Sequence, residues 1–198
     1  MSIDEILRAE LSRIGLSLSN SIQAKLVLYV QELERWNRTV NLTSLKGAEL
    51  IRRLVVEPAW IGHELQLSGT LADIGSGNGS PAVSLCVTRN LQQAHLIEAR
   101  TKRAAFLRQV AQRLELQQIV VHRCRVEDIQ EKFQPVDCIT MQAVSPTPQL
   151  MGSLRRIFSE TTRVVWITSG TNAPAKHAVH ISVPGSNSEV WDFRLDQI

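Results

Sequence analysis

The stretch that most constrains the fold of this chain is residues 71–81, with the sequence LADIGSGNGSP. A short apolar run leads into three glycines at alternate positions, Gly75, Gly77 and Gly79, and residues 82–87 beyond them are compatible with a helix. Glycine adopts positive φ angles at little cost and lets a ligand approach the main chain. A helix that begins there exposes free N–H groups. The pattern therefore predicts a strand, a tight turn and a helix start, with a ligand at the turn.

The glycine spacing and the acid before it indicate which ligand this turn accepts. The dinucleotide fingerprint is G-x-G-x-x-G and binds a pyrophosphate, whereas here the spacing is G-x-G-x-G and Ser80 stands where the third glycine of the fingerprint would be. Asp73 precedes the first glycine by two residues; its carboxylate would repel a pyrophosphate but can accept hydrogen bonds from an amino group. S-adenosylmethionine carries an ammonium and a sulfonium and no phosphate, so it fits better. An ordinary glycine-rich strand-to-helix turn is the alternative.

A second acid supports the nucleoside interpretation. Glu98 ends the next apolar run, residues 95–97. It lies about 25 residues beyond Asp73, close to the spacing at which an acid binds ribose hydroxyls in nucleotide-binding folds.

From Thr70 onward the pattern alternates between strands and helices, which is typical of a parallel sheet. The strand candidates are residues 70–74, 94–98, 118–122, 136–140 and 163–168, with the clearest helix at residues 101–116 and a final antiparallel hairpin at residues 177–183 and 189–195. We therefore predict a mostly parallel sheet of about seven strands. Ligands of such sheets bind at the carboxyl ends of the strands, where Asp73, Glu98 and residues 125–128 and 141–144 are expected to meet.

The first 67 residues form a predicted helical cap. Residues 2–5 read as a capping box before an amphipathic helix, and a longer apolar stripe from Ile22 to Trp36 predicts a second helix. A third helix is expected over residues 47–65, with an irregularity at Pro58. Because no Pro/Gly/Ser-rich linker follows the cap, we predict a single domain over residues 1–198, with a helical cap at 1–67 and a core of alternating strands and helices at 68–198.

Composition narrows the class of protein. The chain is 43% hydrophobic and 21% charged, as soluble globular proteins are. No apolar run approaches a length of about 18 residues, which a membrane span needs. Residues 1–5 lack the basic-then-apolar order of a signal peptide. Three scattered cysteines suggest neither a metal site nor a disulfide framework. We expect a cytoplasmic monomer without a metal or a membrane partner.

Positive charge is concentrated in one segment. Residues 100–125 carry seven Lys or Arg against a single acid, Glu115. An excess of this kind predicts a surface that faces a polyanion. A solvated helix face is the alternative.

Several stretches together resemble one family: residues 36–37 with 41–43, the loop 73–79, the helix 102–108 and residues 125–127. The chain resembles the bacterial guanine-N7 methyltransferases of 16S ribosomal RNA, also called glucose-inhibited division protein B. The resemblance runs from about residue 24 to 145 and more weakly to about residue 170.

This resemblance implies an α/β Rossmann-like, S-adenosylmethionine-dependent methyltransferase fold and 16S rRNA of the small ribosomal subunit as substrate. It places Gly75 and Ser80 at the methionine part of the cofactor, Glu98 at the ribose, and Val126 and Glu127 at the adenine. Other candidates come from the glycine turn, the strand ends and the basic segment. They are Asp73, Gly77, Gly79 and Gln142 for the cofactor, and Lys102, Arg103, Arg108 and Arg125 for RNA phosphates. No catalytic residue is assigned.

The chain also departs from the family pattern. Residues 53–57 stand where the family has His-x-x-Asp-Ser, and residues 80–82 replace a large apolar residue, Pro and Gly. Gln142 replaces an Arg near the cofactor, and Ser169 replaces a Lys. Two expected cations are thus missing. Besides rRNA methylation, two other functions remain open: a cofactor-binding regulator without activity, and a methyltransferase that acts on a small molecule or protein.

Overall fold

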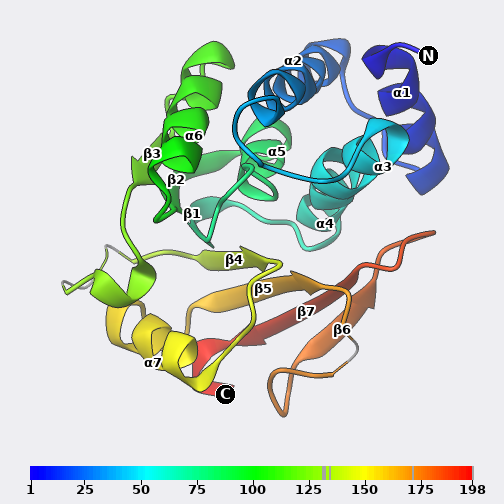
Figure 1. Cartoon of the computed structure of the whole chain (residues 1–198). Coiled ribbons are helices and arrows are strands. Elements are labelled where there is room, and N and C mark those ends of the chain that lie inside the picture. Colours follow the sequence, from blue (N-terminus) through cyan, green and yellow to red (C-terminus); the bar gives the residue numbers. More distant parts are fainter. Residues whose placement is uncertain (131–132, 134, 171, 198) are drawn as a thin grey trace.

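The structure is a computed structural model that describes residues 1–130, 133, 135–170 and 172–197. A seven-stranded sheet forms its centre (Figure 1). The strands are β1 (Gly69–Ile74), β2 (Leu91–Ile97), β3 (Ile119–His122), β4 (Cys138–Gln142), β5 (Arg163–Thr168), β6 (Val179–Ser182) and β7 (Glu189–Arg194).

The strand order is β3-β2-β1-β4-β5-β7-β6. The first five strands pair in parallel, and β7 pairs antiparallel with both β5 and β6. This confirms the predicted mostly parallel sheet with a closing hairpin. The predicted fourth strand, residues 136–140, begins two residues too early. Val136 is buried in the core but precedes the hydrogen-bonded strand, so its apolar side chain misled the prediction.

Helices cover both faces of the sheet. They are α1 (Ile3–Ile14), α2 (Asn20–Asn37), α3 (Gly47–Ile51), α4 (Glu57–Glu64), α5 (Ala82–Thr88), α6 (Thr101–Arg113) and α7 (Pro148–Ile157), with a π-helical segment η1 (Arg52–Val56) and 3-10 turns η2 (Val126–Asp128) and η3 (Leu195–Gln197). Helices α1 to α6 lie on one side of the sheet and α7 lies on the other (Figure 1). The strand sequences alternate accordingly: Leu71 faces the core under α1 to α6, and Ala72 faces the core under α7.

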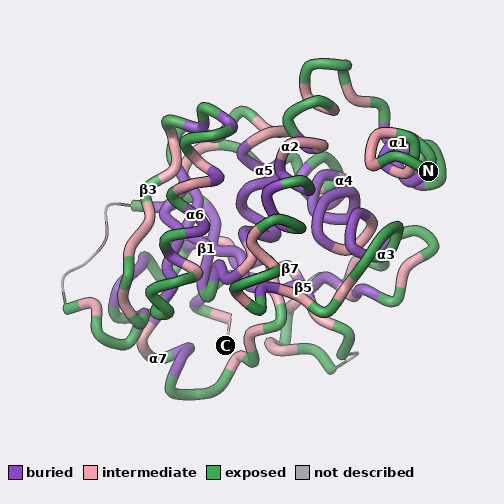
Figure 2. The backbone as a smooth tube through the Cα atoms, turned by 45° about the horizontal axis from the view of Figure 1, so that its top comes forward, coloured by how far each residue is buried: buried purple, intermediate pink, exposed green. Residues whose placement is uncertain are grey.

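The cap belongs to the larger of these two cores. Leu26, Tyr29 and Leu33 of α2 are fully buried in one cluster with Leu71 and Leu96 of the sheet. The buried residues gather in β1, α5 and the inward turns of α4 and α6 (Figure 2). The predicted capping box is present, since the Ser2 hydroxyl accepts the Glu5 N–H and the Glu5 carboxylate accepts the Ser2 N–H.

The third predicted helix is continuous from α3 through η1 to α4, and its irregularity lies one turn before Pro58. Proline has no N–H to donate to the carbonyl four residues earlier, which is that of Leu54. This carbonyl instead accepts a hydrogen bond from the Ser84 hydroxyl at 3.0 Å. The contact joins the cap to the helix after the glycine turn.

Helix α7 and the connection between β5 and β6 lie in the C-terminal half of the chain. Helix α7 was not predicted, although Leu150, Leu154 and Ile157 are buried at helical spacing after the Thr147 cap. Between β5 and β6, residues 169–170 and 172–178 contain no helix. In the described part of the chain, no helix has the length and apolar character to span a membrane.

Candidate active site

The glycine turn after β1 has the predicted backbone. Gly75, Gly77 and Gly79 have φ angles of 71°, 45° and 91°. Space is also restricted: a Cβ on Gly79 would lie 2.8 Å from Val83 Cγ2 and 3.0 Å from the Tyr29 hydroxyl. Glycine is therefore required both by the backbone angle and by close packing against the cap.

Glu98, at the end of β2, supports this turn. Its buried carboxylate accepts hydrogen bonds from the Gly77 N–H at 2.9 Å and the Arg100 N–H at 2.7 Å. Each carboxylate oxygen has two lone-pair sites, so both oxygens can still accept from ribose hydroxyls. The sequence predicted a ligand-binding role for Glu98 but not its role in holding the turn.

Asp73 lies buried beneath the turn, at the end of β1. One oxygen accepts a 2.6 Å hydrogen bond from Thr140 on β4, and the other, Oδ2, is buried without a partner in the described residues. Burial raises the pKa of Asp73 to about 7, and the hydrogen bond from Thr140 opposes that shift. A buried carboxylate oxygen without a donor is costly, and a ligand ammonium would satisfy it.

Two cavities meet at the glycine turn, and both are lined by Gly75. The larger, of about 300 Å³, lies between the turn, the ends of β4 and β5, and the cap. The smaller, of about 270 Å³, lies beside the ends of β1 and β2, next to η2 and the segment after β4. Gly75 therefore lies where two cavities adjoin, one beside Glu98 and the other beside the cap.

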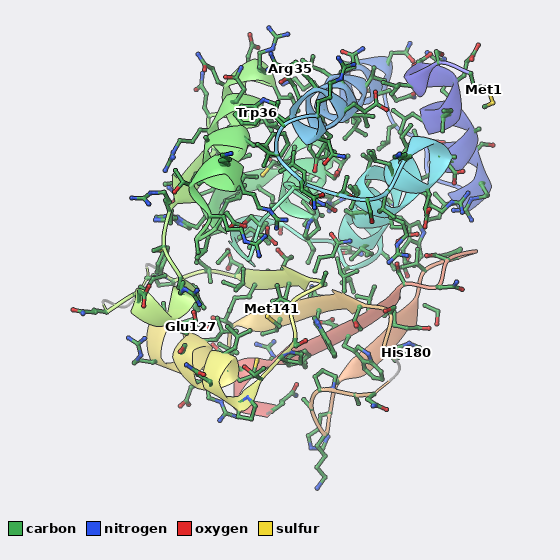
Figure 3. All side chains as sticks on the ribbon, viewed as in Figure 1. Met1, Arg35, Trp36, Glu127, Met141 and His180 are labelled. Carbon is green, nitrogen blue, oxygen red and sulfur yellow. The ribbon has the colours of Figure 1, made fainter. Side chains whose placement is uncertain are left out.

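The structure divides the predicted cofactor residues between these cavities. Gly75, Gly77, Ser80 and Gln142 line the larger one. Gly75, Glu98, Val126 and Glu127 line the smaller one, together with Arg125. Glu127 lies on η2, between α7 and the helices on the other side of the sheet (Figure 3). Asp73 and Gly79 are not among the lining residues; they lie beneath the turn and against Tyr29 and Val83.

Unpartnered polar atoms concentrate at this site. Among the described side chains, six buried nitrogen or oxygen atoms lack a hydrogen-bond partner. Four of the six belong to residues at the turn or in the larger cavity: Asp73 Oδ2, Ser80 Oγ, Gln142 Oε1 and Arg53 Nε. Buried polar atoms in proteins are normally hydrogen-bonded. Their concentration here fits a polar ligand with both donors and acceptors, such as an amino acid group.

The cap supplies residues that sequence reasoning did not assign to the site. Asn37 accepts hydrogen bonds from the Leu42 and Thr43 N–H groups and donates to the Thr43 carbonyl. Thr43 thereby lines the larger cavity, together with Leu45 and Arg53. The only signal in the sequence was the motif of residues 41–43.

The predicted RNA-binding residues do not form one free surface. Lys102, Arg108 and Arg125 are exposed, but Arg108 donates to the Val121 carbonyl at 3.3 Å. Arg103 is half-buried and donates to the Asn41 carbonyl at 3.0 Å, so it also joins α6 to the cap.

Within the described residues, no group of three or more His, Cys, Asp or Glu side chains could hold a metal ion.

The fold and the turn define a class. This strand order, with the glycine turn after β1 and an acid at the end of β2, is that of the Rossmann-like S-adenosylmethionine-dependent methyltransferases. A solved S-adenosylmethionine-dependent methyltransferase from Aquifex aeolicus superimposes with a TM-score of 0.57 at 12% identity, over 81% of this chain and 96% of that protein.

The sequence comparisons identify the family. The family described as rRNA small subunit methyltransferase G matches residues 22–179, and this chain belongs to that family. A ribosomal RNA small subunit methyltransferase G from Granulibacter bethesdensis is 38% identical over 148 residues, 74% of this chain and 68% of the relative. The Neisseria meningitidis serogroup B protein of the same name is 35% identical over 133 residues, 66% of this chain and 64% of the relative. The chain thus spans about two thirds of these relatives, and the resemblance seen in the sequence is confirmed.

Proposed function

We propose that this chain transfers a methyl group from S-adenosylmethionine to N7 of a guanine in 16S rRNA. The observation that carries the proposal is the pair of cavities at the glycine turn, with the unpartnered polar atoms around them. The family match supports it, because the curated relatives are ribosomal RNA small subunit methyltransferases. A cytoplasmic location and a monomeric state belong to the same proposal.

The residues of the two cavities suit the parts of this cofactor. In the smaller cavity, Glu98 would accept from the ribose hydroxyls, and Val126 with Glu127 would lie against the adenine. At the turn, Asp73 Oδ2 would accept from the ammonium. Ser80 and Gln142 offer further polar atoms in the larger cavity. When bound, the cofactor supplies an electrophilic methyl group on a sulfonium.

The proposed reaction requires no proton transfer to or from the protein. Guanine N7 has a free lone pair and no proton to remove, so no general base is needed. The chain would act by aligning the base with the methyl group and by excluding water. In an RNA helix N7 faces the deep, narrow groove, so the target has to be unpaired or flipped out.

A transfer assay tests the proposal. The protein is incubated with methyl-labelled S-adenosylmethionine and small ribosomal subunits from cells that lack the modification. We expect label in 16S rRNA at guanine N7, and none with the Asp73→Ala variant. Cofactor binding without transfer would instead identify a non-catalytic relative. Transfer to a small molecule or protein, but not to RNA, would identify the third function.

A charge-reversal pair tests the RNA surface. Lys102→Glu and Arg108→Glu together should weaken rRNA binding about tenfold or more at low salt, because phosphate contacts dominate such affinities. Arg103 is left intact because it holds the cap. The matched control reverses Arg8 and Lys25, two exposed cations of α1 and α2. Equal RNA affinity of both double variants would remove α6 from the proposed interface, while cofactor affinity should be the same in all three proteins.

A further inference from the structure

The larger cavity contains one charged side chain among the described residues that line it, that of Arg53. The other polar side chains that line it are neutral: Thr43, Asn78, Ser80, Gln142, Thr168 and Ser169. Arg53 comes from η1, the π-helical segment of the cap, whereas most of the other polar lining residues lie at the ends of sheet strands or just after them. The cap therefore brings a single positive charge to a cavity that is otherwise uncharged.

The guanidinium of Arg53 has N–H groups that remain available to donate hydrogen bonds. Its Nε is buried and donates no hydrogen bond in the described part of the chain. The nearest acid is Glu57, whose Oε2 lies 3.7 Å from Nε, too far for a hydrogen bond. The side chain of Arg53 is 33% exposed and lines the larger cavity, so a ligand in that cavity can reach it.

Glu57 explains why these donors stay free. Its carboxylate is 1% exposed and accepts hydrogen bonds from the Ser186 hydroxyl at 2.5 Å and the Ser188 hydroxyl at 2.6 Å. Both serines lie on the connection between β6 and β7. The two serine hydroxyls hold the Glu57 carboxylate with Oε2 3.7 Å from Arg53 Nε, so Glu57 provides a negative charge beside Arg53 without accepting a hydrogen bond from that N–H.

We propose that Arg53 binds an oxyanion in the larger cavity and so positions the reactants. The inference rests on the proposed function. The oxyanion is either the carboxylate of the cofactor's methionine part or a phosphate next to the target base. An arginine fork suits both groups, since it presents two parallel N–H donors to two oxygens. Gln142 and Ser169, at the ends of β4 and β5, offer no positive charge for this purpose.

Calorimetry and kinetics with the Arg53→Gln variant test the inference. The probes are S-adenosylmethionine, its decarboxylated form, and 16S rRNA in small subunits. Losing charge-assisted hydrogen bonds should weaken binding by about 10- to 100-fold. A loss for S-adenosylmethionine but not for the decarboxylated form assigns the carboxylate. Unchanged binding of both cofactors, with KM for the subunits raised to the same extent, assigns the phosphate.

Two outcomes would overturn the inference. One is a variant that equals the wild type with all three probes; the other is an equal loss for both cofactor forms, which reports a distorted site rather than a lost anion contact. Arg8→Gln, an exposed cation of α1, is the control for charge and should leave every value unchanged. If Arg53→Gln fails to fold because Glu57 loses its counter-charge, the same comparison is made between Glu57→Gln and the double variant Glu57→Gln/Arg53→Gln. A wild type that neither binds the cofactor nor methylates RNA refutes the proposed function itself.

Discussion

At the scale of single residues, the buried carboxyl of Asp73 couples cofactor binding to pH. Burial raises its pKa to about 7, so below that pH the free protein holds Asp73 largely protonated. An ammonium placed at Oδ2 favours the ionised form, and binding must then release a proton. The affinity for S-adenosylmethionine should therefore rise between pH 5 and 7, by up to about tenfold per pH unit.

Calorimetry in two buffers that differ in ionisation enthalpy measures both the affinity and the proton release. The range stops at pH 7 because an α-amino group titrates near pH 7.7–8.0, so the cofactor's ammonium stays charged throughout. The Asp73→Asn variant should bind more weakly and with no pH dependence. A wild-type affinity that is constant from pH 5 to 7 would contradict this account of Asp73.

Gly79 should tolerate no side chain. Its φ of 91° is unfavourable for alanine, and the new Cβ would lie 2.8 Å from Val83 Cγ2. The strained backbone and the overpacking together should lower the free energy of unfolding by about 2–4 kcal/mol, measured by denaturant unfolding. Gly152 of α7 is the matched control: it has no atom within 4 Å of an added Cβ. Gly152→Ala should stabilise the helix by about 0.5–1 kcal/mol. Similar effects of the two substitutions would show that the turn is not strained.

At the scale of elements, the connection between β6 and β7 is hydrogen-bonded to the cap. Ser186 and Ser188 donate to Glu57 at the start of α4, and Arg13 of α1 donates to the Gly185 carbonyl at 3.0 Å. Because Glu57 is buried, removal of both hydroxyls leaves its charge without hydrogen-bond donors. The double variant Ser186→Ala/Ser188→Ala should lose about 3 kcal/mol or more of unfolding free energy.

Denaturant unfolding measures that loss, and amide hydrogen exchange should show faster opening of β6 and β7. Ser182→Ala serves as the control, because Ser182 is an exposed residue of the same hairpin with only a 3.4 Å contact to Glu189. A double variant as stable as this control would mean that Glu57 does not hold the hairpin.

The elements also show what the sequence can and cannot predict. The sheet was predictable because each strand carries its own apolar pattern, and the glycine turn because glycines with positive φ have few substitutes. Helix α7 could have been found from its apolar spacing and the Thr147 cap. The contact of Glu57 with Ser188 joins residues 131 positions apart, and the entry of Arg53 into the cavity depends on the cap packing onto the sheet. Neither has a local pattern that a sequence could reveal.

At the scale of the whole molecule, the cap and the sheet share one hydrophobic core. Leu26, Tyr29 and Leu33 of α2 are fully buried in the cluster that contains Leu71 of β1. The Tyr29 hydroxyl donates to the Asn78 carbonyl at 2.8 Å, so the cap also holds the glycine turn. Removal of the cap would expose that face of the sheet to water and free the turn at the same time.

We therefore expect residues 68–198 not to fold alone. The whole chain should unfold in one cooperative transition, followed by circular dichroism and tryptophan fluorescence with coincident midpoints. The fragment 68–198 should show no cooperative transition and no dispersion of its amide NMR signals, because the apolar surface under α2 and α4 would lack a partner. A cooperative transition of the fragment would show instead that residues 1–67 are a separable domain. Residues 68–198 should depend on the cap because helix α2 completes the hydrophobic core and, through Tyr29, also fixes the glycine turn at which the ligand is proposed to bind.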